Sequence, residues 1–265
     1  MTAIALTIAG SDSGGGAGIQ ADLKTFSALG VFGTSVITAI TAQNTQGVRG
    51  VEDISPGMIA AQIDALYDDM EIGAAKIGMV SRIDTITAIA DGLRRYHVRP
   101  VIDPVMIATS GDRLLQPDAI DALRTKLLPQ AVIITPNLPE AALLSGMPLA
   151  EDETQMIAQA EILLRTGTDA VLIKGGHGTG PESTDLLLDG NSLVRLSRPR
   201  IDTPNTHGTG CTLSAAITAG LARGLPLAEA VAQAREYLHR ALQAAAALAI
   251  GKGSGPVHHF HGWWR

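Results

Sequence analysis

The sequence predicts an α/β protein in three layers, with a mostly parallel central sheet, helices on both faces and an antiparallel hairpin at one edge. Short runs rich in β-branched residues alternate with longer amphipathic stretches rich in alanine and leucine. This alternation is typical of a buried parallel sheet whose strands are joined by helices. Two further runs flank Asp189-Gly190-Asn191, a turn sequence that predicts the hairpin. No repeat, linker or break in composition divides residues 1–265, which predicts a single domain.

The strands are expected where short runs of valine, isoleucine and threonine lie between turn residues. These runs occupy residues 4–8, 36–41, 74–77, 100–102, 131–134 and 170–173, and the hairpin strands occupy 184–188 and 193–196. Longer stretches with apolar residues at helical spacing separate the strands and predict helices. They occupy residues 18–29, 57–70, 83–96, 119–128, 152–166, about 210–223 and about 227–249.

Composition narrows the class of protein. With 46% hydrophobic and 17% charged residues, the chain can bury a substantial core and is not disordered. The formal net charge is −6 and no cluster of lysine or arginine occurs, so we expect no nucleic-acid partner. The apolar run 244–250 is much shorter than the ~20 residues that span a bilayer, so we expect no membrane partner. The start shows no export-signal pattern and Cys211 is the only cysteine, which together predict a cytoplasmic protein.

Glycines, amides, carboxylates or a lysine directly follow six of the expected strands. Ligands of parallel sheets bind at the carboxyl ends of the strands, and these ends share one edge. Any one of these residues could simply cap a helix or form a turn, but all six groups together predict a binding site. The segments are 10–18, 43–44, 78–79, 103–106, 135–140 and 174–177.

Two familiar glycine motifs do not explain this site. Residues 16–21 match the dinucleotide pattern G-x-G-x-x-A, but Gln43-Asn44 stands where a ribose-binding acid should end the second strand. A P-loop requires Gly-Lys followed by serine or threonine, whereas Gly251-Lys252 is followed by glycine. The sequence therefore excludes a P-loop nucleotidase and supports a dinucleotide site only weakly.

The lone cysteine stands directly behind His207-Gly-Thr-Gly, where a helix is expected to begin. The first N–H groups of a helix have no partner within it, so Gly208, Thr209, Gly210 and Cys211 predict an anion hole. A thiol at a helix N-terminus has a pKa below the free value of about 8.5 and can accept a proton from an alcohol. We therefore expect Cys211 to act as the base in phosphoryl transfer to a hydroxyl group. The alternative is an ordinary helix cap beside a small buried hydrophobe.

Phosphoryl transfer also needs a divalent cation and a positive charge for the donor. Asp103 and Glu140 follow neighbouring strands and are expected to hold Mg²⁺ directly or through water. Lys174 ends the sequence Val-Leu-Ile-Lys and is expected to reach the donor phosphates. Each residue has a simpler alternative, because Glu140 could be an early-helix acid and Lys174 could point outward from a strand end.

Eight segments resemble the hydroxymethylpyrimidine/phosphomethylpyrimidine kinases, thiamine-pathway members of the ribokinase-like superfamily. The resemblance runs from residue 4 to residue 260 in the order that the family shows. The segments are residues 9–25, Ala-Gln-Asn-Thr (42–45), Lys-Ile-Gly-Met (76–79), Asp-Pro-Val-Met (103–106), Thr-Pro-Asn-Leu-Pro-Glu (135–140), Leu-Ile-Lys-Gly-Gly-His (172–177), residues 205–216 and Gly-Pro-Val-His-His-Phe (255–260).

The resemblance implies a ribokinase-like fold and an ATP-dependent kinase of thiamine biosynthesis. Such a kinase phosphorylates 4-amino-5-hydroxymethyl-2-methylpyrimidine and then phosphorylates the monophosphate to the diphosphate. The resemblance gives Cys211 the role of base and places Asp103 and Glu140 near Mg²⁺. Most ribokinase-like sugar kinases carry aspartate where Cys211 stands, so the thiol points to the vitamin kinases. The residues assigned to the pyrimidine pocket are Gly10, Asp22, Gln43, Met79 and Val105, and those assigned to the nucleotide are Asn137, Lys174 and Thr206.

The residue chemistry agrees with an aminopyrimidine but leaves alternatives. Gln43 offers one donor and one acceptor, although it could merely end the second strand. Asp22 could face solvent, and Met79 and Val105 could be core residues. One rival function is another vitamin kinase that acts on pyridoxal or hydroxyethylthiazole, and another is a protein that binds a pyrimidine or nucleotide without catalysis. We also expect the protein to form a homodimer.

Overall fold

The computed structural model describes residues 2–106, 116, 118–177 and 180–264. Nine strands in these ranges form one sheet in the order β3-β2-β1-β4-β5-β6-β7-β8-β9. Strands β2, β1, β4, β5, β6 and β7 run parallel, whereas β3, β8 and β9 pair antiparallel at the two edges. The strands are β1 (Ile4–Asp12), β2 (Phe32–Asn44), β3 (Gly47–Asp53), β4 (Ala74–Ile77), β5 (Val101–Ile102), β6 (Ile133–Ile134), β7 (Val171–Ile173), β8 (Glu182–Leu188) and β9 (Leu193–Pro199).

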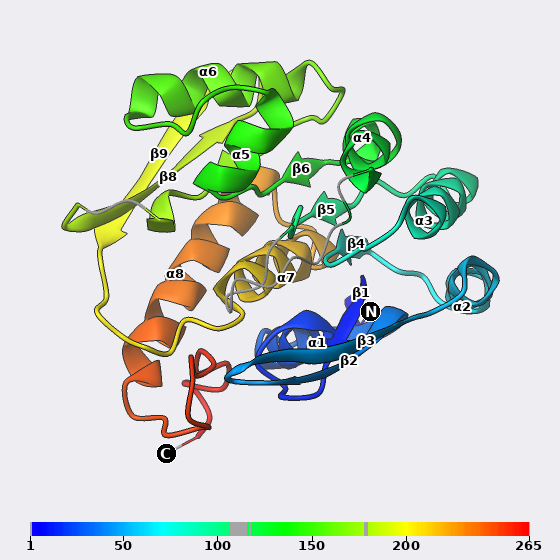
Figure 1. Cartoon of the computed structure of the whole chain (residues 1–265), viewed down its shortest axis with the longest axis horizontal. Coiled ribbons are helices and arrows are strands. Elements are labelled where there is room, and N and C mark those ends of the chain that lie inside the picture. The colour runs from blue at the N-terminus through cyan, green and yellow to red at the C-terminus, as the bar shows by residue number, and fades with distance from the viewer. Residues whose placement is uncertain (1, 107–115, 117, 178–179, 265) are drawn as a thin grey trace.

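Helices cover both faces of the sheet (Figure 1). On one face lie α1 (Gly18–Ala28), α7 (Thr209–Ala222) and α8 (Leu227–Ala245), and α7 packs against both of the others. On the other face lie α2 (Pro56–Tyr67), α3 (Ile83–Arg95), α4 (Ala119–Ala122), α5 (Leu138–Ser145) and α6 (Glu153–Leu164). A π-helical turn at Leu123–Leu127 and 3-10 turns at Leu128–Gln130 and Gly175–His177 complete the helical segments.

The central strands are mostly apolar because both of their faces are covered. Successive side chains of a strand point to opposite faces, so neighbouring residues enter different cores. Ile102 and Ile134 join the core under α3, whereas Val101 joins the core under α7 and α8. Continuous apolar runs of this kind distinguish a buried parallel sheet from a half-exposed one.

The predicted three-layer α/β fold with a mostly parallel sheet and an antiparallel edge hairpin is confirmed, with two omissions. Strand β3 was not predicted because its sequence, Gly-Val-Arg-Gly-Val-Glu-Asp, has no apolar alternation and the strand is largely exposed. It pairs with β2, which continues to Asn44 instead of ending at Thr41, so Gln43 lies within a hairpin. Helix α5 was not predicted because it has only 8 residues, which is too short for an apolar periodicity to stand out.

No helix of the described ranges is long and apolar enough to cross a membrane.

Candidate active site

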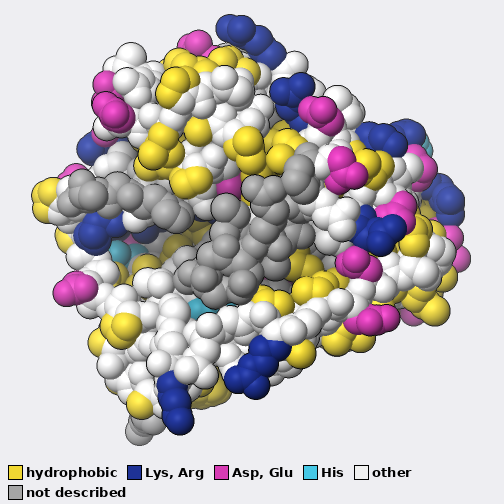
Figure 2. All heavy atoms as spheres, viewed as in Figure 1, with side chains coloured by type: hydrophobic (Ala, Val, Ile, Leu, Met, Phe, Trp, Pro, Cys, Tyr) yellow, Lys and Arg dark blue, Asp and Glu magenta, His cyan; other side chains and the backbone are white. Residues whose placement is uncertain are grey.

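A cavity of about 670 Å³ opens at the carboxyl edge of the parallel strands. On this face of the molecule a hollow lies between α5 and the β2–β3 hairpin, with apolar and histidine side chains at its floor (Figure 2). Each of the six strand ends singled out in the sequence contributes to the lining, which confirms that they converge. Among the lining residues are Gly10, Asp12, Gln43, Met79, Asp103, Val105, Asn137, Glu140, Lys174, Thr206, His207 and Cys211.

Asp12 organises the glycine loop between β1 and α1. Its carboxylate accepts hydrogen bonds from the amides of Gly14, Gly16 and Ala17 at 2.8–3.1 Å. The same carboxylate lies 2.9 Å from Nε2 of His207, the residue just before the predicted anion hole. Burial opposes the charged form of Asp12, but the hydrogen bonds from His207 and the loop amides outweigh it and hold its pKa below the usual value. Asp12 thus joins the glycine loop to the turn that precedes α7.

Gly208 allows that turn to approach the glycine loop closely. Its φ is +80°, and an added Cβ would lie 1.9 Å from the carbonyl oxygen of Gly16. The first hydrogen bond of α7 runs from the Thr212 amide to the Gly208 carbonyl. The Thr209 amide already bonds to Thr206 at 3.3 Å, so it is a weaker donor for a ligand than the predicted anion hole assumes. The backbone of Gly210 and Cys211 borders the cavity at the start of the helix.

The C-terminal segment supports this turn from behind. The backbone of His207 pairs with Pro256, and its amide donates to the Gly255 carbonyl at 3.0 Å. Nε2 of His259 lies 3.1 Å from Oγ1 of Thr212, the residue after Cys211. Burial lowers the pKa of His259 to about 3, so its imidazole stays neutral at physiological pH. The tail therefore packs against the start of α7.

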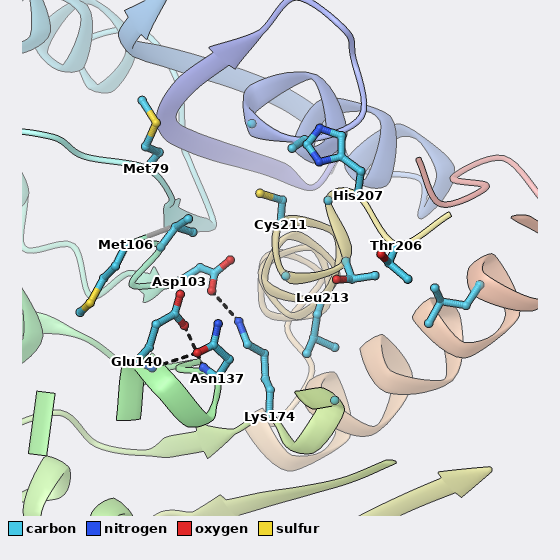
Figure 3. Close-up of a pocket in the computed structure, with 18 of the residues that line it drawn as sticks. Met79, Asp103, Met106, Asn137, Glu140, Lys174, Thr206, His207, Cys211 and Leu213 are labelled. Atoms are coloured by element: carbon cyan, nitrogen blue, oxygen red, sulfur yellow. Dashed lines mark hydrogen bonds and ion pairs between the residues drawn. The ribbon is translucent and has the colours of Figure 1, made fainter. Parts of the chain in front are cut away.

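Cys211 lies where the sequence predicted, but its acidity does not follow the prediction. Its side chain points toward the space near Met79 and Asp103 (Figure 3). Burial raises the pKa of the thiol to about 11, because protein atoms replace the water that would solvate a thiolate. Lys76 and the Gly18 backbone favour the thiolate but do not compensate for the lost hydration. The expectation of a lowered pKa was wrong, because the helix-terminus rule ignores burial by other segments.

Asp103 and Lys174 form an ion pair at the centre of the cavity. Nζ of Lys174 lies 2.8 Å from Oδ1 of Asp103, which also accepts a bond from Thr135 at 3.3 Å (Figure 3). An added Cβ at Gly210 would lie 3.1 Å from Asp103 and 3.3 Å from Lys174, so the pair sits directly beside the start of α7. Burial disfavours the lysine cation, but Asp103 and Glu140 outweigh it and raise the pKa of Lys174.

Asn137 and Glu140 cap the N-terminus of α5 reciprocally. The Glu140 amide donates to Oδ1 of Asn137 at 2.9 Å, and Oε2 of Glu140 accepts from the Asn137 amide at 2.8 Å. Both residues also line the cavity, so the simpler role as a cap and a role toward a ligand coexist. Burial raises the pKa of Glu140 to about 7, and the negative charge of Asp103 adds to this while Lys174 opposes it.

Four of the five residues assigned to the pyrimidine pocket line the cavity. Gly10 permits close contact with the Met79 methyl group, since an added Cβ would lie 2.5 Å from it. Gln43 is half-buried, and its Oε1 accepts a hydrogen bond from Thr41 at 3.1 Å. Val105 contributes to the wall.

Asp22 is the exception, because it does not line the cavity. Its carboxylate is fully buried and lies 2.7 and 2.8 Å from Nζ of Lys76, while Oγ1 of Thr7 donates to it at 2.6 Å. The expectation that Asp22 faces the ligand or solvent is therefore corrected. Lys76 received no role from the sequence, and its position on a short apolar strand is the only signal that marks it as unusual.

The sequence matches the family described as "Phosphomethylpyrimidine kinase" over residues 12–258. The chain belongs to this family. A hydroxymethylpyrimidine/phosphomethylpyrimidine kinase of Rhizobium meliloti is 66% identical over 265 residues, which cover 100% of each protein. The predicted family and enzyme class, a phosphotransferase, are confirmed.

Two solved structures resemble this phosphomethylpyrimidine kinase family member closely. A phosphomethylpyrimidine kinase of Clostridium difficile has a TM-score of 0.81 at 47% identity, covering 90% of this chain and 99% of that one. The pyridoxal kinase of Bacillus subtilis, solved as an ADP complex, has a TM-score of 0.90 at 39% identity, covering 98% of each chain. These likenesses confirm the ribokinase-like architecture.

The contact between Gly208 and the glycine loop predicts a selective loss of kinase activity. Gly208→Ala should reduce phosphotransfer by about 100-fold or more, because a Cβ would push the anion-hole turn away from Gly16. Gly224→Ala is the matched control, since Gly224 has a φ of +83° but open space around the added atom. Left-handed backbone strain should cost both variants roughly 1 kcal/mol of stability, and Gly208→Ala should lose more because its Cβ also clashes with the Gly16 carbonyl. Initial rates and thermal melts measure both effects, and wild-type turnover by Gly208→Ala would contradict the account.

The raised pKa of Glu140 predicts a pH-dependent stability. Between pH 4.5 and about 7 the folded state binds this proton more tightly than the unfolded chain, so unfolding free energy falls as pH rises. Glu140→Gln keeps the acceptor for the Asn137 amide but removes the titration, and its melting temperature should lack this decline. Glu161→Gln, at an exposed position of α6, should retain it. If the melting temperature depended on pH in the same way for wild type and Glu140→Gln, the Glu140 carboxyl would have an ordinary pKa and the prediction would be wrong.

Proposed function

We propose that this protein transfers the γ-phosphoryl group of ATP to the hydroxymethyl group of 4-amino-5-hydroxymethyl-2-methylpyrimidine and then to the resulting monophosphate. The observation that carries the proposal is the position of Cys211 at the start of α7, in one cavity with Gln43 and the Asp103–Lys174 pair. Binding alone would not need a base beside that helix start. The family and the ADP complex of the B. subtilis neighbour support ATP as the donor.

We assign the triphosphate to the part of the cavity that Lys174, Asn137 and Thr206 line. The ammonium of Lys174 can pair with a phosphate oxygen, and the amides of Gly210 and Cys211 can hold the transferring group. In the ligand-free protein Lys174 pairs with Asp103, so nucleotide binding would redistribute this charge.

Asp103 and Glu140 fit a Mg²⁺ ion that arrives with ATP. The charge of Asp103 helps to raise the pKa of Glu140. A divalent cation would lower this pKa again and displace the proton. The described residues contain no group of three or more His, Cys, Asp or Glu side chains that could hold a metal, so phosphates and water must complete the coordination. Bound Mg²⁺ would neutralise the phosphate charge during transfer.

We assign the pyrimidine to the part of the cavity lined by Gly10, Gln43, Met79 and Val105. The carboxamide of Gln43 can donate to a ring nitrogen and accept from the exocyclic amine. Met79 and Val105 offer apolar surface to the faces of the ring. This orientation would direct the hydroxymethyl group toward Cys211.

In the proposed step, the substrate hydroxyl oxygen bonds to the γ-phosphorus while the bond from that phosphorus to the bridging oxygen of ADP breaks. The hydroxyl proton passes to the Cys211 sulfur, and ADP leaves with the bonding electrons. Since the thiol has a pKa of about 11, the base is its minor, deprotonated form at neutral pH, and the thiol later returns its proton to solvent. In-line transfer needs no phosphocysteine.

Pyridoxal is the alternative acceptor that a specific observation favours, since a pyridoxal kinase shares this fold at 39% identity. Rates with the pyrimidine alcohol, pyridoxal and hydroxyethylthiazole in the presence of Mg·ATP decide between them. We expect the highest kcat/KM for the pyrimidine alcohol and further ADP release with its monophosphate. A higher kcat/KM for pyridoxal would reassign the substrate, and calorimetric binding of the pyrimidine without ADP release would indicate a binding protein.

The same assay tests the thiol. Cys211→Ala should lower kcat by about 100-fold or more with little change in KM, because it removes the proton acceptor without removing ligand contacts of the pyrimidine. Near-normal turnover would show that Cys211 lines the cavity without acting as the base. The predicted homodimer and cytoplasmic location remain predictions.

A further inference from the structure

The strongest unassigned feature is the charged pair buried beneath the cavity. Lys76 on β4 and Asp22 on α1 both have side chains that are 0% exposed, and Nζ of Lys76 lies 2.7 and 2.8 Å from the two carboxylate oxygens. A buried ion pair is weak support for stability, because apolar residues of similar volume often serve as well or better. Fold stability alone therefore gives little reason for charges at the centre of the sheet.

The position of Lys76 connects it to the thiol. Helix α7, whose first turn holds Cys211, packs against β4 and against α1. The amide of Gly18, one turn before Asp22 in α1, is a hydrogen-bond partner of the Cys211 sulfur. An added Cβ at Gly78 would lie 3.1 Å from Nζ of Lys76, so the ammonium sits immediately below the segment that delivers Met79 to the cavity. Lys76 itself does not line the cavity and is not placed to touch a ligand.

Four charged groups act on the Cys211 thiol from the elements around it. Lys76 is the largest influence that favours the thiolate, whereas Asp22 and Asp103 disfavour it and lost hydration raises the pKa. Lys174 is also coupled to the thiol from β7. Burial disfavours the Lys76 ammonium, but the negative charges of Asp22, Cys211 and Asp103 together outweigh burial and raise the pKa of Lys76.

We propose that Lys76 is a positioning residue of the phosphotransfer reaction, whose buried ammonium, held by Asp22, fixes a positive charge on the strand against which the helix of Cys211 packs and lets its sulfur carry negative charge. This inference rests on the proposed role of Cys211 as proton acceptor. Asp22 then acts indirectly, because it orients Lys76 and keeps it protonated, and Lys76 in turn acts on Cys211. This role explains a buried carboxylate that does not line the cavity.

The lone cysteine allows a direct test, because alkylation of the native protein by iodoacetamide reports Cys211 alone. In Lys76→Met we expect the alkylation rate between pH 7.5 and 9 to fall about threefold for each unit by which the thiol pKa rises, allowing for the greater nucleophilicity of a more basic thiolate. We expect kcat to fall by a similar factor, with the KM of the pyrimidine unchanged. Lys126→Met is the control, since Lys126 is exposed and donates to Thr87, away from the Asp22–Lys76 pair.

Asp22→Asn/Lys76→Met provides a second variant that leaves no unpaired buried charge and should fold if Lys76→Met does not. Its thiol should also react more slowly than wild type, because Lys76 acts on Cys211 more strongly than Asp22 does. Unchanged alkylation and kcat in a folded variant would overturn the inference and leave the pair structural. Slower alkylation in a protein that phosphorylates none of the three alcohols would instead overturn the proposed function, and with it the catalytic part of the inference.

Discussion

The site depends on one close backbone contact, that of Gly208 with Gly16. This contact brings the start of α7 against the glycine loop before α1, so two helix N-termini face one cavity. No side chain larger than hydrogen fits at Gly208, and Asp12 bridges the same two segments through His207 and the loop amides. The parallel sheet makes the contact possible, because it delivers both segments to the same edge. The convergence of partial positive charge there suits an anionic phosphoryl group.

Several charged side chains near this contact are buried within a largely apolar fold. Asp103 with Lys174 and Asp22 with Lys76 are opposite-charge pairs, of which the second is fully buried and the first is largely buried. Each pair lessens the cost of placing a charge away from water. Burial raises the pKa of Asp22 despite its partner, and it also raises the pKa of two groups that line the cavity, Glu140 and Cys211. These two groups are therefore the ones whose protonation a bound cation or nucleotide can most readily change.

Most of the fold and the list of cavity residues could be predicted from the sequence, because both follow from local patterns. The buried strands are continuous apolar runs, and the residues after them share an edge by the geometry of parallel sheets. Properties set by distant segments could not be predicted. Asp22 and Lys76 are 54 positions apart and carry no pattern that links them. The helix-terminus rule gave the wrong direction for the Cys211 thiol, because burial by surrounding elements outweighs the local dipole.

The central claim is that the sulfur of Cys211 accepts the proton of the acceptor alcohol while the start of α7 holds the transferring group. A crystal structure with the pyrimidine alcohol, Mg²⁺ and a non-hydrolysable ATP analogue measures this directly. We expect the hydroxymethyl oxygen within hydrogen-bond distance of the Cys211 sulfur, the pyrimidine edge on Gln43 and the γ-phosphate on the amides of Gly210 and Cys211. A hydroxymethyl group directed away from Cys211, with another side chain at hydrogen-bond distance, would contradict it.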